Sequence, residues 1–548
     1  MPGRLPPHTY YRASSSPDSY PSLQGGRECA VCVIGAGFAG LGTAMSLAER
    51  GERDVVVLEA EEVGHGASGR NGGFVFGGFS LGERALQRSA GPAARQLYGD
   101  TLAAVGLIRA RIRRHDIACE ARESGVILAN WFEDERILVE QQRFMAEHMG
   151  VHWQHLGRDE LSDRLRTRRY KGGLFEPGAF HFHPLKYAQG LARTLAQSGV
   201  AIHEHSRVTA LRRQDGGWLV TTAHGTVAAR ELVVCCGGYL ASLHRRLRAA
   251  ILPIATYVMT TEPLGERLAS SIRTDAAVYD TRFAFDYYRA LPDTRLLWGG
   301  RISILHRSPR AVARLLYGDM LKVYPQLKGV RVEHAWSGLM SYARHKMPQV
   351  GRLPDGLWYG MGFGGHGVAP TTLAGELLAG ALTGEGGPLR QYARWGLPWT
   401  GGPAGLAAAQ ATYWYYGLRD LLRREARRLR RRTRHASPAS PAASMGSTPG
   451  SGTGKGGTGF VSCRWMLANE YRDTCAWVCA SAQLYQSTAS VKSAACAKPS
   501  APDWLRRSAP IRSCSESSTW PSAPVSYTMS RFSDRNWTLT SPPAMPAA

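Results

Sequence analysis

The stretch CAVCVIGAGFAGLGTAMSLAERG, residues 29–51, decides which fold this chain of 548 residues adopts. An apolar run leads into Gly35, Gly37 and Gly40, and leucines and alanines then recur at helical spacing. A second apolar run, DVVVLEA, reaches Glu59, 19 residues after the last of these glycines. A strand, a glycine turn, a helix and a second strand that ends near an acid are typical of a dinucleotide-binding Rossmann unit.

Each residue of this motif has a physical role in such a unit. Gly35 permits the tight turn, Gly37 lets the backbone approach a pyrophosphate, and Gly40 lets the helix pack on the strand. The free N–H groups at the start of the helix favour phosphate. The carboxylate of Glu59 accepts hydrogen bonds from ribose hydroxyls and repels a 2′-phosphate, which argues against NADP. The motif alone leaves NAD and FAD open, and a glycine-rich turn in an unrelated α/β unit is the alternative.

Charge and cysteine content narrow the class of protein. The net charge is +24, of which residues 419–435 hold +7 and residues 1–418 hold +12, so the main part is basic without the extreme of a nucleic-acid-binding protein. Cys29 and Cys32 form a CxxC pair without a second pair, and we interpret them as buried thiols in a reducing compartment. We find no secretory signal and no apolar run of the ~20 residues that a membrane span needs. We therefore expect a cytoplasmic protein without a membrane span and without a specific nucleic-acid partner.

A second glycine-rich stretch, GASGRNGGF at residues 66–74, follows the acid of the first motif. With it the sequence resembles the FAD-dependent oxidoreductases of the D-amino-acid oxidase/glycine oxidase superfamily, in particular the branch that contains gamma-glutamylputrescine oxidoreductase. Further resemblances to this branch follow along the chain, in HTYYRA (8–13), the segment from His181 to Leu211, RELVVCCGGYL (230–240), YYRALPDTRLLWGGR (287–301) and residues 336–382. The resemblance implies FAD as the cofactor. Cys235 and Cys236 stand where the family carries smaller residues, and we do not expect them in the site.

The resemblance also implies which residues hold the flavin. Ser68 and Arg70 are expected near the diphosphate, the backbone of residues 71–73 near the isoalloxazine ring, and Val208 beside the adenine. A positive helix end after the last glycine loop is expected at the pyrimidine ring, where it favours the anionic reduced flavin. The implied FAD-binding residues are Gly35, Ala36, Gly37, Gly40, Glu59, Ala60, Ala67, Ser68, Arg70, Asn71, Gly72, Gly73, Val208, Gly237, Gly364, Gly365, Gly367 and Val368.

The mode of flavin attachment follows from two positions. Some relatives tether FAD through a histidine near the second glycine stretch or through a cysteine shortly before the last one. This chain has Asn71 at the first position and no cysteine between Trp336 and Gly367. We therefore predict non-covalent FAD.

The resemblance implies that a substrate C–H next to nitrogen delivers a hydride to the flavin, in a dry pocket that orients the amine. The catalytic candidates are Arg289, Tyr288 and His366. Arg289 is suited to a substrate carboxylate, with a salt bridge on a strand surface as the alternative. Tyr287 and Tyr288 alternate in a strand, so at most one of them reaches the pocket. His366 is expected at the flavin rather than as a base.

Two further features have structural alternatives. Trp336 is a candidate for the pocket wall, although a structural role is the favoured interpretation. His181 and His183 have the spacing of half a metal site, but no third ligand follows nearby in the sequence. We predict no metal.

The expected fold class is α/β (α+β overall), with a Rossmann-like FAD-binding domain interleaved with an antiparallel-sheet substrate domain. The expected boundaries are an N-terminal arm (1–28), the FAD domain (29–80, 175–245 and 330–400), the substrate domain (81–174 and 246–329), a helix with a basic end (401–435) and a disordered tail (436–548).

We predict FAD-dependent oxidation of an amine or amino acid to an imine that hydrolyses, with O2 or another acceptor re-oxidising the flavin. Two alternatives stay open at this point. One is a dehydrogenase of the same fold that passes electrons to a carrier. The other is a flavin-binding protein without turnover that uses its basic helix end to bind nucleic acid or acidic headgroups.

Overall fold

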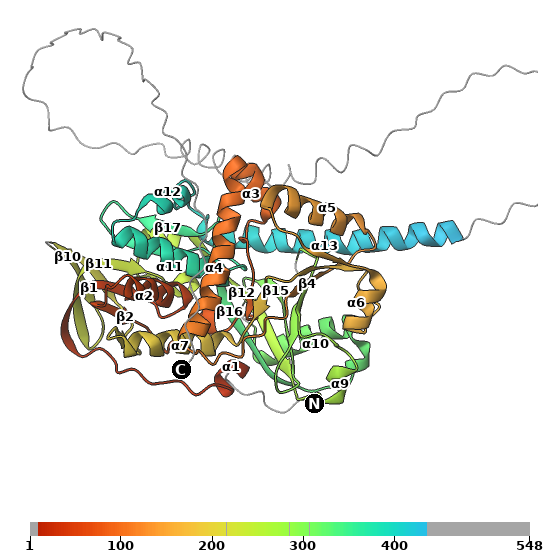
Figure 1. Cartoon of the computed structure of the whole chain (residues 1–548), viewed down its shortest axis with the longest axis horizontal. Coiled ribbons are helices and arrows are strands. Elements are labelled where there is room, and N and C mark those ends of the chain that lie inside the picture. The colour runs from red at the N-terminus through yellow and green to blue at the C-terminus, as the bar shows by residue number, and fades with distance from the viewer. Residues whose placement is uncertain (1–8, 215, 284, 306, 436–548) are drawn as a thin grey trace, which may run out of the picture. The chain divides into compact units, whose positions relative to one another are not determined.

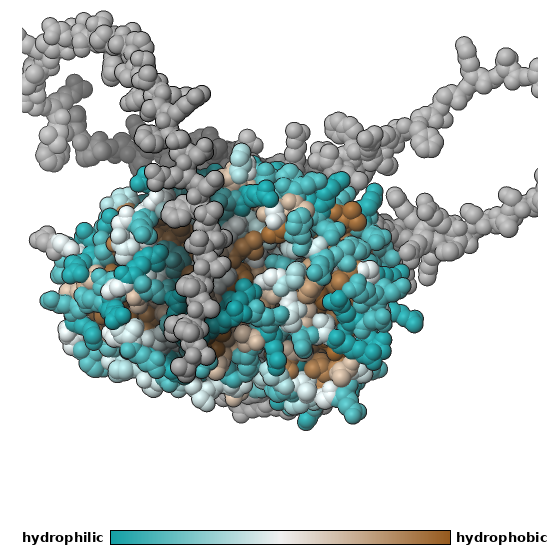
Figure 2. Space-filling view, in the orientation of Figure 1, coloured by the Kyte–Doolittle hydropathy of each residue, from teal (hydrophilic) through white to brown (hydrophobic). Residues whose placement is uncertain are grey.

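The structure, a computed structural model, describes residues 9–214, 216–283, 285–305 and 307–435 (Figure 1). The expected tail at 436–548 and the first eight residues lie outside this range. Two eight-stranded sheets organise the described part of the chain, and a two-stranded ribbon, β3 (Phe74–Val75) with β7 (Phe180–His181), accompanies them. In the space-filling view most of the visible surface is hydrophilic, with apolar residues in smaller patches (Figure 2).

The first sheet contains the Rossmann unit that residues 29–60 predict. Its strand order is β17-β18-β11-β1-β2-β8, and β1, β2, β8, β11 and β18 are parallel where they pair. β2 is buried along its whole length, as expected for an apolar strand in the middle of a parallel sheet. The strands are β1 (Gly25–Ile34), β2 (Val55–Leu58), β8 (Ala201–His203), β9 (Ala210–Gln214), β10 (Gly217–Thr221), β11 (Gly225–Val234), β17 (Gln349–Arg352) and β18 (Trp358–Met361).

Two helices with small residues cross closely beside this sheet. α2 (Phe38–Glu49) follows the first glycine turn, and α11 (Val368–Leu382) follows the last glycine loop. A Cβ atom at Gly375 of α11 would lie 2.5 Å from the backbone carbon of Gly42 in α2, so glycine is required for this contact. The crossing therefore places the starts of both helices relative to each other. α4 (Ala94–Arg114), α7 (Pro184–Gln197) and α12 (Gly387–Ala393) complete this layer.

The second sheet has the order β16-β12-β15-β14-β13-β4-β6-β5 and is antiparallel except for the pair β4–β13. α10 (Pro309–Val323) packs on it through a core of Leu316, Met320 and Trp298. Its strands are β4 (Val126–Ala129), β5 (Gln154–Leu156), β6 (Gly173–Glu176), β12 (Ile251–Thr261), β13 (Ala277–Asp280), β14 (Tyr287–Ala290), β15 (Leu296–Ser303) and β16 (Val332–Ala343). The remaining helices are α1 (Tyr10–Ala13), α3 (Glu83–Ala90), α5 (Arg136–Phe144), α6 (Arg158–Leu165), α8 (Arg245–Ala249), α9 (Glu266–Ala269) and α13 (Gly402–His435). None of the helices between residues 9 and 435 has both the length and the apolar character needed to cross a bilayer.

The expected interleaved fold class is confirmed, but two of the expected boundaries are wrong. β16 lies in the range 330–400, expected in the FAD domain, yet it pairs with β12 in the second sheet along its whole length. α4 lies in the range 81–174, expected in the substrate domain, yet its buried residues share one core with α2 and α11. The domain to which each element belongs is set by the sheet or helix that buries its apolar face. Because these partners lie far away in the sequence, the boundaries could not be predicted from local patterns.

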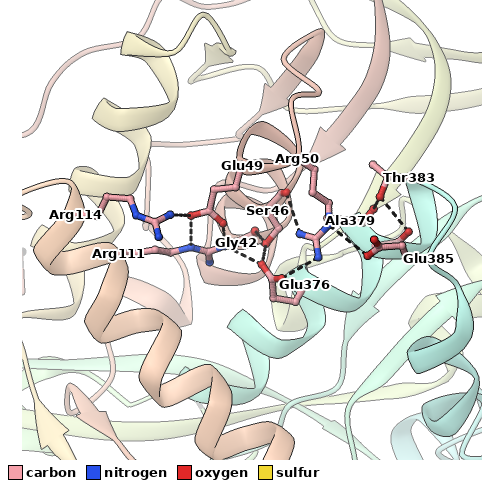
Figure 3. Close-up of polar contacts among 11 residues, drawn as sticks. Gly42, Ser46, Glu49, Arg50, Arg111, Arg114, Glu376, Ala379, Thr383 and Glu385 are labelled. Carbon is pink, nitrogen blue, oxygen red and sulfur yellow. Dashed lines mark hydrogen bonds and ion pairs between the residues drawn. The ribbon is translucent and has the colours of Figure 1, made fainter. Parts of the chain in front are cut away.

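A buried ion cluster joins α2, α4 and α11 (Figure 3). The guanidinium of Arg111, which is fully buried, donates to Glu49 at 2.6 Å and to Glu376 at 2.9 Å. Ser46 donates to the same Glu376 carboxylate. One cation thus holds an acid from each of the two helices that begin at the glycine loops.

We expect Arg111→Met to lower the free energy of unfolding by about 3 kcal/mol, because two carboxylates in a low-dielectric layer lose their common partner. Arg113→Met is the matched control. Arg113 is 70% exposed and binds only Glu123, so its loss should cost less than about 1 kcal/mol. Urea unfolding of the flavin-loaded protein measures both. Equal midpoints for the two variants would contradict this role of Arg111.

Candidate active site

The first glycine turn has the geometry that close packing demands. Gly35 has a φ of +106°, in the region that favours glycine, and a Cβ at Gly40 would lie only 1.8 Å from the Gly35 carbonyl oxygen. Gly37 precedes α2 with extended backbone and no side-chain cap. The N–H of Phe38 donates to Ser68 Oγ at 2.8 Å, which brings the second glycine stretch to the start of α2. The first turns of α2 therefore face the loop expected at the diphosphate.

Glu59 lies beside the first glycine turn, at the end of the site expected to bind the adenosine. Its carboxylate accepts hydrogen bonds from the backbone N–H of Ala36 at 2.8 Å and of Glu61 at 3.1 Å. Burial raises the pKa of Glu59, and these N–H groups oppose the rise. The N–H of Ser206 donates to the Glu59 carbonyl, so the chain approaching Val208 runs beside the acid. The position suits the two ribose hydroxyls of an adenosine.

Asn71 fixes the second glycine stretch internally. Its side-chain amide donates to the carbonyls of Ala67 at 3.1 Å and Ser68 at 2.8 Å, and its oxygen accepts from the Gly73 N–H at 2.7 Å. Gly73 has a φ of +79°, and a Cβ there would lie 2.1 Å from the Phe182 carbonyl oxygen. The loop is therefore a fixed turn whose glycines allow neighbouring parts of the chain to pack closely against it.

Arg70 holds this loop from outside. Its Nε donates to the His65 carbonyl at 2.7 Å and one Nη donates to the Ser337 carbonyl at 3.3 Å. The indole N–H of Trp336 donates to the Arg70 carbonyl at 3.0 Å. Arg70 thus anchors the loop to β16, and Trp336 has the structural role favoured from the sequence.

Arg289 is a buried anchor for the same loop. It is 2% exposed, and its Nε donates to the Gly72 carbonyl while one Nη donates to the Phe182 carbonyl, both at 2.8 Å. Its remaining neighbours are the Tyr11 hydroxyl at 3.4 Å and His181 Nδ1 at 3.5 Å. Nε and one Nη thus anchor the loop through backbone carbonyls, and a substrate carboxylate at the other N–H groups stays a prediction. The alternative of a surface salt bridge is wrong, because this side chain is buried.

The two tyrosines of β14 face opposite sides of the sheet, as the strand period requires. Tyr288 is fully buried, stacks on Trp298 at 4.5 Å between ring centroids, and accepts a hydrogen bond from Tyr324. It belongs to the core beneath α10, and we do not retain it as a catalytic candidate. Tyr287 lies on the other face, where its ring is 5.6 Å from that of Phe74, beside the second glycine stretch.

The last glycine loop is bound to the segment that follows the second stretch. The N–H of Gly365 donates to Ser80 Oγ at 3.0 Å, and Gly364 has a φ of +64°. α11 then begins after Gly367 without a side-chain cap, so its first N–H groups and its positive end are available to a ligand. Farther along the first sheet, Gly237 opens a short turn whose Tyr239 packs on Gly66. Gly237 therefore supports the second stretch through Tyr239.

His366 is a neutral imidazole in this loop. Its ring lies 4.2 Å from that of Phe76, and burial lowers its pKa to about 4 against the opposing carbonyls of Phe76 and Gly77. Its Nε2 is buried and has no hydrogen-bond partner within the described residues. A buried nitrogen without a partner beside a glycine loop fits a site that a ligand completes.

Two acids that the sequence did not single out lie in this region, Glu83 beside His366 and Glu176 near Glu83. A Cβ at Gly78 would lie 3.1 Å from Glu83 Oε1 and 3.6 Å from His366 Cε1, so these side chains meet across Gly78. Glu176, at the end of β6, is 8% exposed, and burial together with Glu83 raises its pKa to about 8. An acid closing the otherwise apolar strand GLFE was the signal available in the sequence.

The phenols of Tyr98 and Tyr279 complete this acidic cluster of Glu83, Glu176, Tyr98 and Tyr279. Burial first, and then the negative potential of both acids, raises the pKa of each phenol. Tyr279 also stacks on Phe76, the residue in contact with His366. The cluster thus adjoins the loop that opens α11.

The residues present fit FAD. The first glycine turn contacts the second stretch, and the last glycine loop contacts Ser80 shortly after that stretch. Glu59 suits the ribose, and the uncapped starts of α2 and α11 suit the diphosphate and the pyrimidine ring. When bound, FAD supplies the acceptor for a hydride from carbon. Within residues 9–435 no group of three or more metal-ligating side chains converges.

Comparison with known proteins gives the class of protein. A family model described as FAD dependent oxidoreductase matches residues 30–381. Gamma-glutamylputrescine oxidoreductase of Escherichia coli is 36% identical over 76% of this chain and 98% of that protein. A probable oxidoreductase, OrdL, of Haemophilus influenzae is 33% identical over 69% and 88%.

Solved structures agree on the fold. Glycine oxidase of Geobacillus kaustophilus superposes with a TM-score of 0.56 at 22% identity, covering 65% of this chain and 95% of that one. L-amino acid deaminase of Proteus vulgaris gives 0.56 at 20% identity, covering 70% and 96%. The chain belongs to the DAO family of FAD-dependent oxidoreductases. It is an enzyme of amine or amino-acid oxidation.

The attachment of FAD remains a prediction. We expect all flavin to appear in the supernatant after acid precipitation of the loaded protein, because Asn71 carries no nucleophile for the ring. Flavin absorbance of the supernatant and of the washed pellet measures how much flavin is free and how much stays with the polypeptide. A yellow pellet after unfolding would show a covalent bond and contradict the expectation.

Proposed function

We propose that the enzyme oxidises a primary amine whose reacting end is an aliphatic ammonium group, with no carboxylate on the reacting carbon. The observation that carries this proposal is the acidic cluster beside His366, in which the nearby Glu83 carboxyl group adds to the rise in the pKa of Glu176. Two buried carboxyl groups near one another favour a positive ligand, since each alone is costly to ionise in a dry site. The name of the Escherichia coli relative, gamma-glutamylputrescine oxidoreductase, supports an amine of this kind.

The surroundings of Arg289 argue against an amino acid as the preferred substrate. An α-carboxylate next to the reacting carbon needs a cation or several donors at that place. Arg289, the candidate for this role, is held by the Gly72 and Phe182 carbonyls. The space on its other side is a cavity of about 50 Å³ whose charged lining residues are the acids Glu120 and Asp275 and the arginines Arg122 and Arg289. Such a cavity is small, and its acids offset its arginines, so it offers no excess of positive charge to a carboxylate.

We assign proton transfer to Glu176. A substrate ammonium must lose a proton before its carbon can release a hydride, and a carboxyl group with a pKa of about 8 is ionised, and so able to accept that proton, at mildly alkaline pH. The Gly77 N–H stabilises the ionised form, and Glu83 opposes it. His366 stays neutral at pH 7 and is placed to accept or donate one hydrogen bond through its unpartnered Nε2.

The complete reaction takes an amine, O2 and water to an aldehyde, ammonia and hydrogen peroxide. The amine carbon loses a hydride and the nitrogen a proton, giving an imine whose hydrolysis releases ammonia. We propose O2 as the acceptor that takes up the two electrons, in a cytoplasmic enzyme. The buried thiols Cys29, Cys32, Cys119 and Cys235 are free in the described part of the chain, which suits a reducing compartment.

The proposal is tested by product analysis of the flavin-loaded enzyme in air. Putrescine and gamma-glutamylputrescine are compared with glycine, sarcosine and a D-amino acid, with aldehyde, ammonia and peroxide measured together. Equal amounts of the three products from the amines, and a kcat/KM at least tenfold lower for the amino acids, are expected. Aldehyde without peroxide would show that an electron carrier, and not O2, re-oxidises the flavin. A preference for the amino acids would refute the proposed substrate class.

A further inference from the structure

The last helix turns an apolar face outward. α13 (Gly402–His435) exposes Trp414 by 65%, Tyr415 by 62%, Leu418 by 56% and Leu422 by 61%. At 100° per residue, these four positions fall within about a quarter to a third of the helix circumference. Surface helices normally turn their polar residues outward, and an exposed stripe of large apolar residues marks an interaction site.

The opposite face of α13 is already occupied. Gln410 is 7% exposed and accepts from the Ile304 N–H at 3.0 Å. Tyr416 stacks on Phe283 at 4.3 Å, and the Phe283 N–H donates to the Asp420 carboxylate at 3.2 Å. The helix is therefore docked on the second sheet through its polar and aromatic inner face, and the outer stripe has no part in that docking.

The stripe leads directly into the most basic segment before residue 436. Residues 419–435 carry nine arginines against Asp420 and Glu425. Asp420 is engaged with Phe283 in the docked face. In Figure 1, α13 extends with this end past the neighbouring elements of the fold. Apolar aromatic residues and a cationic end thus follow one another along a single helix.

We propose that α13 binds an anionic lipid surface through its outer face, defined as the stripe of Trp414, Tyr415, Leu418 and Leu422, together with the arginine-rich sequence that follows the stripe. Trp and Tyr favour the boundary between headgroups and acyl chains, Leu enters the apolar side, and Arg meets acidic headgroups. A helix with such a face lies in the plane of the surface and does not cross it.

The charge of the chain and its apolar stripe favour an anionic lipid surface over a second copy of the protein or a nucleic acid as the binding partner of this face. A second copy would bring another chain of net charge +24 to a basic face, which opposes association. A nucleic acid would neutralise the arginines but would leave four large apolar side chains without a partner. An anionic bilayer satisfies both halves of the face at once.

The test is cosedimentation of the full-length, flavin-loaded protein with vesicles. Vesicles of phosphatidylglycerol and phosphatidylcholine in equal parts are compared with vesicles of phosphatidylcholine alone, at low and high salt. The variant replaces Trp414, Leu418 and Leu422 by Ser. The matched control is Val139→Ser, since Val139 is 50% exposed on α5 and does not belong to the stripe. Flavin content and amine oxidation are measured for each protein to show that the fold and the site persist.

We expect at least tenfold tighter binding to the anionic vesicles, lost in the triple variant, weakened by salt and unchanged in the control. Equal binding of the triple variant and the wild type would overturn the proposal. A dimer in light scattering without lipid that the triple variant abolishes would assign the face to a second copy. Salt-sensitive DNA binding with no vesicle binding would assign it to nucleic acid.

Discussion

Replacement of Glu176 by Gln is expected to lower kcat/KM for the amine substrate about 100-fold, the size of effect found when a positioned general base is removed. Gln keeps the shape of the side chain and can still accept the Gly77 N–H, so the fold and the flavin content should be retained. It cannot take a proton from the substrate ammonium. Steady-state kinetics on protein matched for flavin content measures the change.

The pH profile separates a proton-accepting role from a structural one. A carboxyl group with a raised pKa is protonated, and inactive as a base, below that pKa, so wild-type kcat/KM should rise with pH through about 8. Glu83, Tyr98 and Tyr279 are the titratable groups that face Glu176, and the phenols stay neutral there because their pKa values are raised. In the Gln variant this rise should vanish, leaving only the titration of the substrate amine near pH ~10.

Glu123→Gln is the control for this experiment, since Glu123 forms half-exposed ion pairs with Arg109 and Arg113. Its kinetics and pH profile should match the wild type. A Glu176→Gln enzyme with wild-type kcat/KM and an unchanged rise near pH 8 would remove Glu176 from the chemistry.

Gly40→Ala is expected to abolish FAD binding. The added Cβ would lie 1.8 Å from the Gly35 carbonyl oxygen, so α2 must move away from the glycine turn. The overlap is with backbone, which has no rotamer to relieve it, and the helix start that faces the diphosphate shifts with it. Flavin absorbance per polypeptide should fall more than tenfold, the consequence of losing about 1.4 kcal/mol or more of binding.

Gly99→Ala in α4 is the matched control for this glycine. A Cβ at Gly99 meets nothing within 4 Å, and Ala favours a helix interior over Gly by about 0.5–1 kcal/mol. Full flavin content and equal or greater stability are expected. A Gly40→Ala protein that purifies with full flavin would contradict the packing assigned to the first turn.

The local signals in the sequence were sufficient to predict the Rossmann unit and the three glycine loops. At Gly35, Gly40 and Gly73 a Cβ atom would lie too close to neighbouring backbone, so glycine is required there. Such requirements can be recognised in the sequence because they permit no other residue type at these positions of the motif. The alternation of Tyr287 and Tyr288 was likewise predicted from strand geometry. Which of the two lies in the core was settled only by the packing of α10.

The functions of Arg289 and Glu176 depend on contacts between distant segments. Arg289 donates to the carbonyls of Gly72 and Phe182, which are 217 and 107 positions away in the sequence. Its anchoring role therefore cannot be predicted from the residues next to it in the sequence. The pKa of Glu176 is raised by burial first and then by Glu83 on another element. A lone acid at the end of an apolar strand looks the same whether it is solvated or part of an acidic cluster.

The most direct test of the account is anaerobic reduction of the yellow enzyme, followed by absorbance, with one substrate at a time. Loss of the flavin colour reports hydride transfer itself and does not depend on which acceptor the enzyme uses afterwards. The account predicts rapid bleaching by gamma-glutamylputrescine or putrescine, and bleaching at least ten times slower by glycine, sarcosine or a D-amino acid. Bleaching by the amino acids alone would contradict the amine assignment, and a flavin that no substrate reduces would contradict the catalytic function.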